Sequence, residues 1–70
     1  MTPTPLAIKE EIIRLDSAMK LAGVVMTGGH AKTVIQNGEV AVNGEICTMR
    51  GKKLKKGDTF VFEGKGFVIQ

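Results

Sequence analysis

The segment TGGHAKTVIQNG, residues 27–38, decides how this chain folds. Thr27 is a typical N-cap, because its hydroxyl can accept a hydrogen bond from an unpaired N–H in the first turn of a helix. Gly38 is a typical helix end, since glycine readily adopts the left-handed conformation found there. Three apolar residues recur at helical spacing and form the expected buried face: Ala31, Val34 and Ile35. The segment therefore predicts a short, capped helix.

The residues after this helix predict antiparallel strands. Val40-Ala41-Val42 alternates as a half-buried strand does. Asn43-Gly44 is a strong signal for a two-residue hairpin turn, because both residues tolerate positive φ. Residues Glu45 to Met49 are expected to form the second strand of this hairpin. Further on, Lys56-Gly57-Asp58 predicts a turn into another strand.

The C-terminal part combines a basic run with a second hairpin. Five of the ten basic residues lie between Arg50 and Lys56, and no acidic residue interrupts them. Leu54 is expected to enter the core from within this run. Gly64-Lys65-Gly66 predicts a hairpin that leads into a last strand at Phe67–Ile69. A cluster of like charges on this scale creates a local field that attracts phosphate.

The N-terminal part carries weaker signals. Residues 1–5 include two prolines at alternate positions and are expected to be flexible. Residues 6–13 fit either a short strand followed by a turn or a helical lead-in, and the extended form is favoured. A helix that begins near Arg14 is clearer, and Gly23 would end it. Its apolar stripe consists of Leu15, Ala18, Met19 and Ala22.

The length of 70 residues predicts a single domain spanning residues 1–70. A hydrophobic fraction of 43% is sufficient for a globular core and argues against disorder. The expected fold class is α+β, with two short helices packed on a small, mostly antiparallel β-sheet.

Composition narrows the classes of function. The formal net charge is +3, and the chain has three Phe and no Trp or Tyr, so a stacking platform of several exposed aromatics is not expected. The lone Cys47 cannot form an internal disulfide, which fits a reducing compartment. The sequence has neither a run long enough to span a bilayer nor a signal peptide, so a cytoplasmic protein without membrane contact is expected.

Single residues that could suggest catalysis have simpler explanations. His30 is the only histidine and has no neighbouring partner for metal binding or a triad, so a surface position near phosphate is preferred. Cys47, on a predicted strand, is interpreted as a small buried apolar residue. Asp16 fits a charge in the first turn of a helix, and Asp58 fits a turn. Three methionines are expected in the core or at its rim: Met19, Met26 and Met49.

An ordered series of residues resembles the S4-like RNA-binding domain, also called the alpha-L motif. The matching positions within residues 14–62, the expected core of the domain, are Arg14-Leu15-Asp16, Met19, Gly23, Thr27, Ala31-Lys32, Ile35, Gly38, Val40, Val42-Asn43-Gly44, Leu54 and Gly57-Asp58. The length and the Thr-Gly-Gly helix opening resemble most the stand-alone bacterial S4-like proteins. In one departure, Thr27-Gly28 stands where many members have Ser-Arg, and the basic run is expected to compensate for the missing arginine.

The resemblance implies a non-enzymatic module that docks structured RNA through its helices and a neighbouring loop. Ribosomal RNA or a ribosome assembly intermediate is the favoured target, with transfer RNA as an alternative and ribosomal proteins as further partners. No cofactor or metal is expected, and the protein is expected to be monomeric. Two rival functions are a ribosome-associated protein-interaction adaptor and an accessory domain of an RNA-modifying enzyme. The expected RNA contacts are Arg14, Lys20, Thr27, His30 and Lys32, to which the charge pattern adds Arg50, Lys52 and Lys53.

Overall fold

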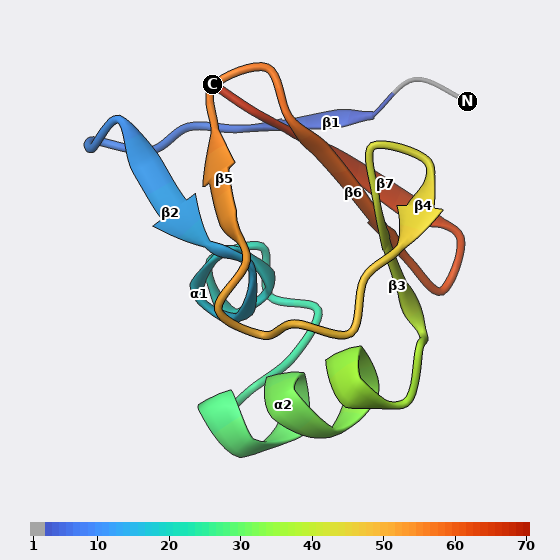
Figure 1. Cartoon of the computed structure of the whole chain (residues 1–70). Coiled ribbons are helices and arrows are strands. Elements are labelled where there is room, and N and C mark those ends of the chain that lie inside the picture. Colours follow the sequence, from blue (N-terminus) through green and yellow to red (C-terminus); the bar gives the residue numbers. More distant parts are fainter. Residues whose placement is uncertain (1–2) are drawn as a thin grey trace.

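The computed structural model of the protein describes residues 3–70. These residues form two helices, α1 (Leu15–Leu21) and α2 (Gly28–Gln36). The strands are β1 (Thr4–Leu6), β2 (Ile12–Arg14), β3 (Val40–Val42), β4 (Glu45–Ile46), β5 (Lys53–Lys55), β6 (Thr59–Phe62) and β7 (Lys65–Ile69). Figure 1 shows both helices to one side of the main sheet, with β2 and β5 next to α1. The α+β class predicted from the sequence is confirmed.

The strands form two sheets. The larger has five strands in the order β1-β7-β6-β3-β4, and the smaller pairs β2 with β5. Every pairing is antiparallel except that of β1 with β7. Within residues 3–70, no helix is long and apolar enough to cross a membrane.

A core of aliphatic and Phe side chains lies between the helices and the sheet. Leu15 and Met19 of α1 are fully buried, as is Ile35 of α2, so both helices turn their predicted apolar stripes inward. The rings of Phe60 and Phe67 stack at 5.1 Å between centroids, which joins β6 to β7 through their side chains. Burying such side chains is the main stabilising contribution for a domain of this size.

The helix ends follow the sequence signals. Arg14 is the N-cap of α1, and Thr27 caps α2 by accepting a hydrogen bond from the backbone N–H of His30 at 3.0 Å. Gly23 and Gly38 follow the two helices, each with a φ of +76°. This left-handed conformation is strained for other residues, so the glycines stop the helices where they stand.

One of the two predicted hairpin turns is confirmed and the other is displaced. Asn43 and Gly44 have φ values of +51° and +87° and connect β3 to β4 as predicted. The second turn lies at Glu63-Gly64, not at Gly64-Lys65-Gly66, because Phe62 pairs directly with Lys65. Gly66 is instead a residue of β7, where a Cβ would lie 3.7 Å from the side chain of Pro3.

The expectation that residues 1–5 are flexible is wrong for Thr4 and Pro5. Both belong to β1, which pairs in parallel with β7. The end of this pairing is fixed by Gln70, whose backbone N–H donates to the carbonyl of Leu6 at 2.9 Å. Proline is tolerated here because an edge strand leaves one row of N–H positions without a partner. Residues 1–2, also included in that expectation, lie outside the described residues.

Candidate nucleic-acid interface

The basic run folds back onto the N-terminus of α1. The backbone N–H of Leu15 donates to the carbonyl of Lys52 at 2.8 Å, and that of Asp16 donates to the carbonyl of Arg50 at 3.1 Å. The first N–H groups of a helix have no partner inside the helix. Here the loop at residues 50–52 satisfies two of them. The same hydrogen bonds fix the backbone of the basic loop beside α1.

The pairing of β2 with β5 brings a further cation to this place. Arg14 lies directly opposite Lys53 in the two-stranded sheet. The Arg14 guanidinium also lies against Gly51, where a Cβ would be 3.7 Å from Nη2. On its other side, Arg14 Nη2 donates to Asp16 Oδ2 at 3.1 Å. Backbone pairing, a glycine and a carboxylate thus orient this one side chain.

The positive charge of this cluster is only partly neutralised. Within residues 3–70, the Arg14–Asp16 contact is the one ion pair between side chains. Arg50, Lys52 and Lys53 are exposed cations that have no such partner among the described residues. Leu54, the next residue, is fully buried and anchors the loop to the core, as predicted. A cluster of like charges held on a fixed backbone raises the local potential and attracts a polyanion.

The N-terminus of α2 contributes a second electropositive element. Its first turn contains no acidic residue. Gly28 and Gly29 are exposed, and a Cβ on Gly28 would meet no atom within 4 Å. In the described part of the chain, neither glycine N–H has a hydrogen-bond acceptor. The positive end of the helix dipole is therefore open to an anion.

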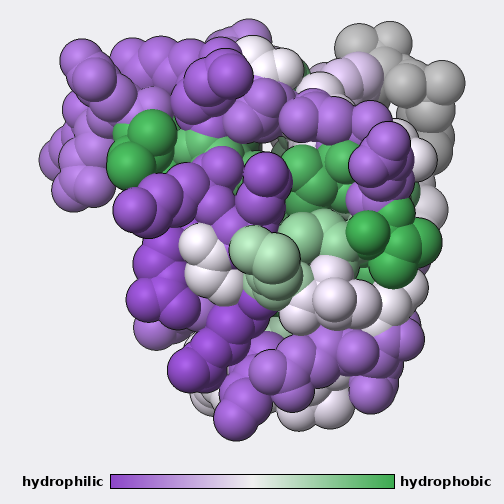
Figure 2. Space-filling model, in the orientation of Figure 1, coloured by the Kyte–Doolittle hydropathy of each residue, from purple (hydrophilic) through white to green (hydrophobic). Residues whose placement is uncertain are grey.

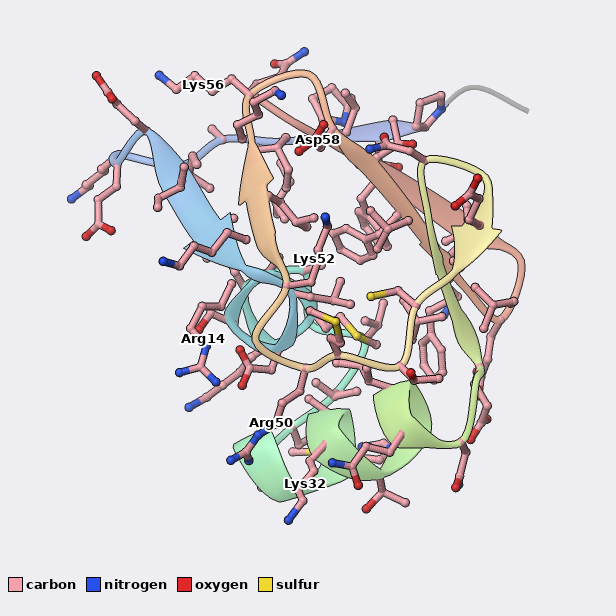
Figure 3. All side chains as sticks on the ribbon, viewed as in Figure 1. Arg14, Lys32, Arg50, Lys52, Lys56 and Asp58 are labelled. Carbon is pink, nitrogen blue, oxygen red and sulfur yellow. The ribbon has the colours of Figure 1, made fainter. Side chains whose placement is uncertain are left out.

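The predicted contact residues fall into two groups. The backbone of Arg14, Arg50, Lys52 and Lys53 lies at the N-terminus of α1, although the Lys52 side chain extends away from Arg50 (Figure 3). Thr27, His30 and Lys32 lie at the start of α2 and are exposed. Lys20 is exposed in the last turn of α1, four residues after Asp16 and so on the same helix face. Figure 3 shows Arg14, Arg50 and Lys32 along the lower left of the molecule and Lys56 at its opposite end.

The far end of the basic run is held by a carboxylate. Asp58 Oδ2 accepts a hydrogen bond from the backbone N–H of Lys55 at 2.9 Å, and Oδ1 accepts one from Asn43 Nδ2 at 3.3 Å. The hydrogen bond from Lys55, supported by Asn43 and by nearby lysine charges, lowers the pKa of Asp58 below its usual value. Asn43 also accepts from the backbone N–H of Thr59 at 2.9 Å. These contacts join the first hairpin to the turn that ends the run.

Sequence reasoning missed the ion pair that orients Arg14. Asp16 does occupy the first turn of α1, but its contact with Arg14 was not foreseen, although the Arg-x-Asp spacing at a helix start could have indicated it.

The expectation for the methionines is confirmed for Met19, which is fully buried, and is wrong for Met26 and Met49, which are 86% and 63% exposed. Both lie in loops, where no helical or strand periodicity determines which way a side chain points.

Comparison with known proteins agrees with this architecture. A family model described as "S4 domain" matches residues 6–70. The chain is also 44% identical over 62 residues to the probable ribosome maturation protein RlbA of Bacillus subtilis (strain 168), and the alignment covers 89% of this chain and 87% of that protein. The resemblance stated from the sequence is thereby confirmed: this chain belongs to the S4 domain family.

Proposed function

We propose that this protein binds structured RNA, with ribosomal RNA or a ribosome assembly intermediate as its target. The observation that carries the proposal is the attachment of the basic loop to α1, in which the carbonyls of Arg50 and Lys52 accept hydrogen bonds from the helix N-terminus. Because the backbone is fixed there, the exposed cations on it have a defined spacing. The similarity to a probable ribosome maturation protein supports a ribosomal target.

The contacts in this proposal are those of the two groups around the helix starts. Arg14, Arg50, Lys52 and Lys53 bind phosphates on one side, and Lys32 with the open end of α2 binds them on the other. Thr27 uses an oxygen lone pair for its cap, which leaves its hydroxyl hydrogen free to donate to phosphate. His30 and Lys20 extend the surface. Contacts to phosphate position a protein and carry little sequence information, so recognition follows RNA shape.

The role proposed is binding without catalysis, by a single-domain, monomeric, cytoplasmic protein. Its cations suit the positioning of an RNA backbone during ribosome assembly. Transfer RNA is the second target to examine, and ribosomal proteins are further partners. A protein-interaction adaptor is the alternative against which the test is designed.

The test is binding to ribosomal subunits and to isolated ribosomal RNA at two salt concentrations. The double variant Lys32→Glu/Lys53→Glu changes one residue in each group of contacts. Its matched control is Lys56→Glu/Lys65→Glu, which makes the same change in net charge. Lys56 lies at the opposite end of the molecule from Arg50 and Lys32 (Figure 3), and Lys65 is the first residue of β7. Circular dichroism confirms that each variant is folded.

The proposal predicts salt-sensitive binding that weakens in the first variant and persists in the control. Losing two phosphate contacts lowers the slope of log K against log salt by about two. Equal, salt-insensitive binding by all three proteins would contradict the proposal and favour the adaptor. Turnover of an RNA substrate by the pure protein would contradict its non-enzymatic part.

A further inference from the structure

A hollow of about 470 Å³ lies beside the basic loop, between that loop and the β3–β4 hairpin. Four apolar or sulfur-containing side chains line it: Val42, Ile46, Cys47 and Met49. Ile46 and Met49 are 64% and 63% exposed, although both are large apolar residues. Figure 2 shows apolar surface at the centre and right of the molecule, surrounded by hydrophilic residues. The hollow therefore combines exposed apolar side chains with polar ones, among them Asn43 and Thr48.

The hollow is continuous with the proposed RNA interface. Lys52 is one of its lining residues, and the carbonyl of the same residue accepts the N–H of Leu15 at the start of α1. The backbone N–H of Lys52 donates to the carbonyl of Met49 at 3.1 Å, so a turn fixes these two residues relative to each other. In Figure 3 the Lys52 side chain extends away from Arg50, into the space between the loop and Asp58.

The charges around the hollow favour an uncharged ligand. Its lining contains one amine, that of Lys52, and one carboxylate, that of Glu45, so their formal charges cancel. A phosphate placed inside would gain little and would lose its hydration. A nucleobase is uncharged, has two apolar faces and carries hydrogen-bonding groups only at its edges. Its phosphate would stay outside, within the field of the basic loop.

We infer that this hollow receives one unpaired nucleobase of the bound RNA, an inference that rests on the proposed function. The base packs its faces against Ile46 and Met49, where the polarisable thioether of Met49 replaces the aromatic ring used in other single-strand sites. Thr48 and Glu45 line the same hollow and provide polar groups for the base edges. RNA with an accessible unpaired base next to a helix is then preferred over fully paired RNA.

The test uses three labelled RNA hairpins of the same stem sequence. One is fully paired, one carries a single bulged nucleotide, and one carries an abasic residue at the bulge. Affinities are measured by fluorescence anisotropy for the wild type, for Met49→Ser and for the matched control Met26→Ser. Met26 is also exposed but is not part of the hollow. Because both methionines are exposed, neither substitution should unfold the protein.

The inference predicts that the wild type binds the bulged hairpin about tenfold more tightly than the other two. Met49→Ser loses this preference and still binds paired RNA, whereas Met26→Ser retains it. A second measurement needs no variant: the methyl resonance of Met49, but not that of Met26, should shift upfield when the bulged hairpin is added, because the ring current of the base acts on it.

Other results would overturn the inference in distinguishable ways. If the bulged and abasic hairpins bind equally well, the protein reads backbone shape and the hollow takes no base. If all three hairpins bind equally, or if Met49→Ser weakens all three alike, the hollow plays no selective part while the proposed function stands. If the wild type binds no RNA at all, the proposed function fails and the inference fails with it.

Discussion

The N-termini of the two helices differ in how their free N–H groups are used. At α1, the carbonyls of Arg50 and Lys52 accept the first N–H groups, and the Asp16 carboxylate accepts the N–H of Ser17 at 2.8 Å. At α2, Thr27 caps the N–H of His30, while the N–H groups of the two preceding glycines have no hydrogen-bond acceptor among residues 3–70. One helix start is closed by the protein itself, and the other is available to a ligand.

This difference shows that equivalent helix ends can serve different purposes in one small domain. The closed end of α1 organises the basic loop, because the carbonyls that cap the helix belong to the residues that carry the charge. The open end of α2 adds backbone donors and a positive dipole to the same surface. If this account is right, changes at the closed end affect stability first, and changes at the open end affect binding first.

The largest effect is expected at the anchor of the closed end. Leu54 is fully buried between two lysines, so Leu54→Ala removes apolar contacts and leaves a cavity. The free energy of unfolding should fall by about 3 kcal/mol, a large share of the roughly 3–5 kcal/mol expected for so small a core. Thermal denaturation measures this, with Val61→Ala on the exposed sheet face as control. A melting midpoint within a few degrees of the wild type would show that the loop is not anchored there.

Removal of the Asp16 carboxylate should affect both stability and binding. Asp16→Ala takes away the acceptor for Ser17 N–H and the partner of Arg14, at a cost of about 1 kcal/mol. RNA affinity should fall about two- to threefold although the net charge rises, because Arg14 loses its fixed position. The control Glu10→Ala raises the net charge equally without touching Arg14. Tighter RNA binding by Asp16→Ala than by Glu10→Ala would mean that total charge, not position, controls affinity.

The far end of the basic run should make stability depend on acid. The pKa of Asp58 is lowered in the folded protein by the hydrogen bond from Lys55, so the ionised carboxylate stabilises the fold. This contribution is complete above the pKa that Asp58 has in the unfolded chain, which is about 4. It is lost as the pH falls through the lower pKa that Asp58 has in the folded protein. Asp58→Asn should therefore be less stable at pH 7 and lose less stability between pH 5 and pH 2. The measurement is urea denaturation of both proteins at several pH values between 2 and 7. If the free energy of unfolding falls equally in the two proteins as the pH is lowered, this role of Asp58 is contradicted.

The smallest effect, with opposite signs for stability and binding, is expected at the open end. Gly28→Ala places a methyl group in open space at the first position of α2. Stability should rise by about 0.5 kcal/mol, because alanine has less freedom in the unfolded chain. RNA affinity should fall about twofold as the methyl group covers nearby N–H groups. Unchanged affinity together with raised stability would remove the end of α2 from the interface.

Features encoded by neighbouring residues were predictable from the sequence. Thr27 and Gly38 define α2, and Asn43-Gly44 defines the first hairpin, because each acts through local backbone preferences. The second hairpin was misplaced because Gly64 and Gly66 both favour turns, and only the register of β6 with β7 decides between them. The burial of Leu54 was predictable from its position as an apolar residue among lysines.

Features that depend on pairing between distant segments were not predictable in this way. Nothing near Thr4 indicates that it will pair with Phe67, or that the carbonyls of Arg50 and Lys52 will cap a helix more than thirty residues earlier. The basic residues themselves could be named from the sequence, and the structure places the backbone of four of them beside the start of α1. Their contacts with RNA stay predictions, since charge identifies a surface and not its ligand.

The most direct test of the account is the shift of each backbone amide resonance when ribosomal RNA fragments are added to ¹⁵N-labelled protein. The account predicts that the amides of Gly28, Gly29 and Lys32 and those of the loop at residues 50–53 shift strongly, and that the amides of Lys56 and Lys65 do not. The already bonded amide of Leu15 should shift less than that of Gly28. Shifts confined to the exposed face of the main sheet, or shifts that leave Gly28 and Gly29 unchanged, would contradict it.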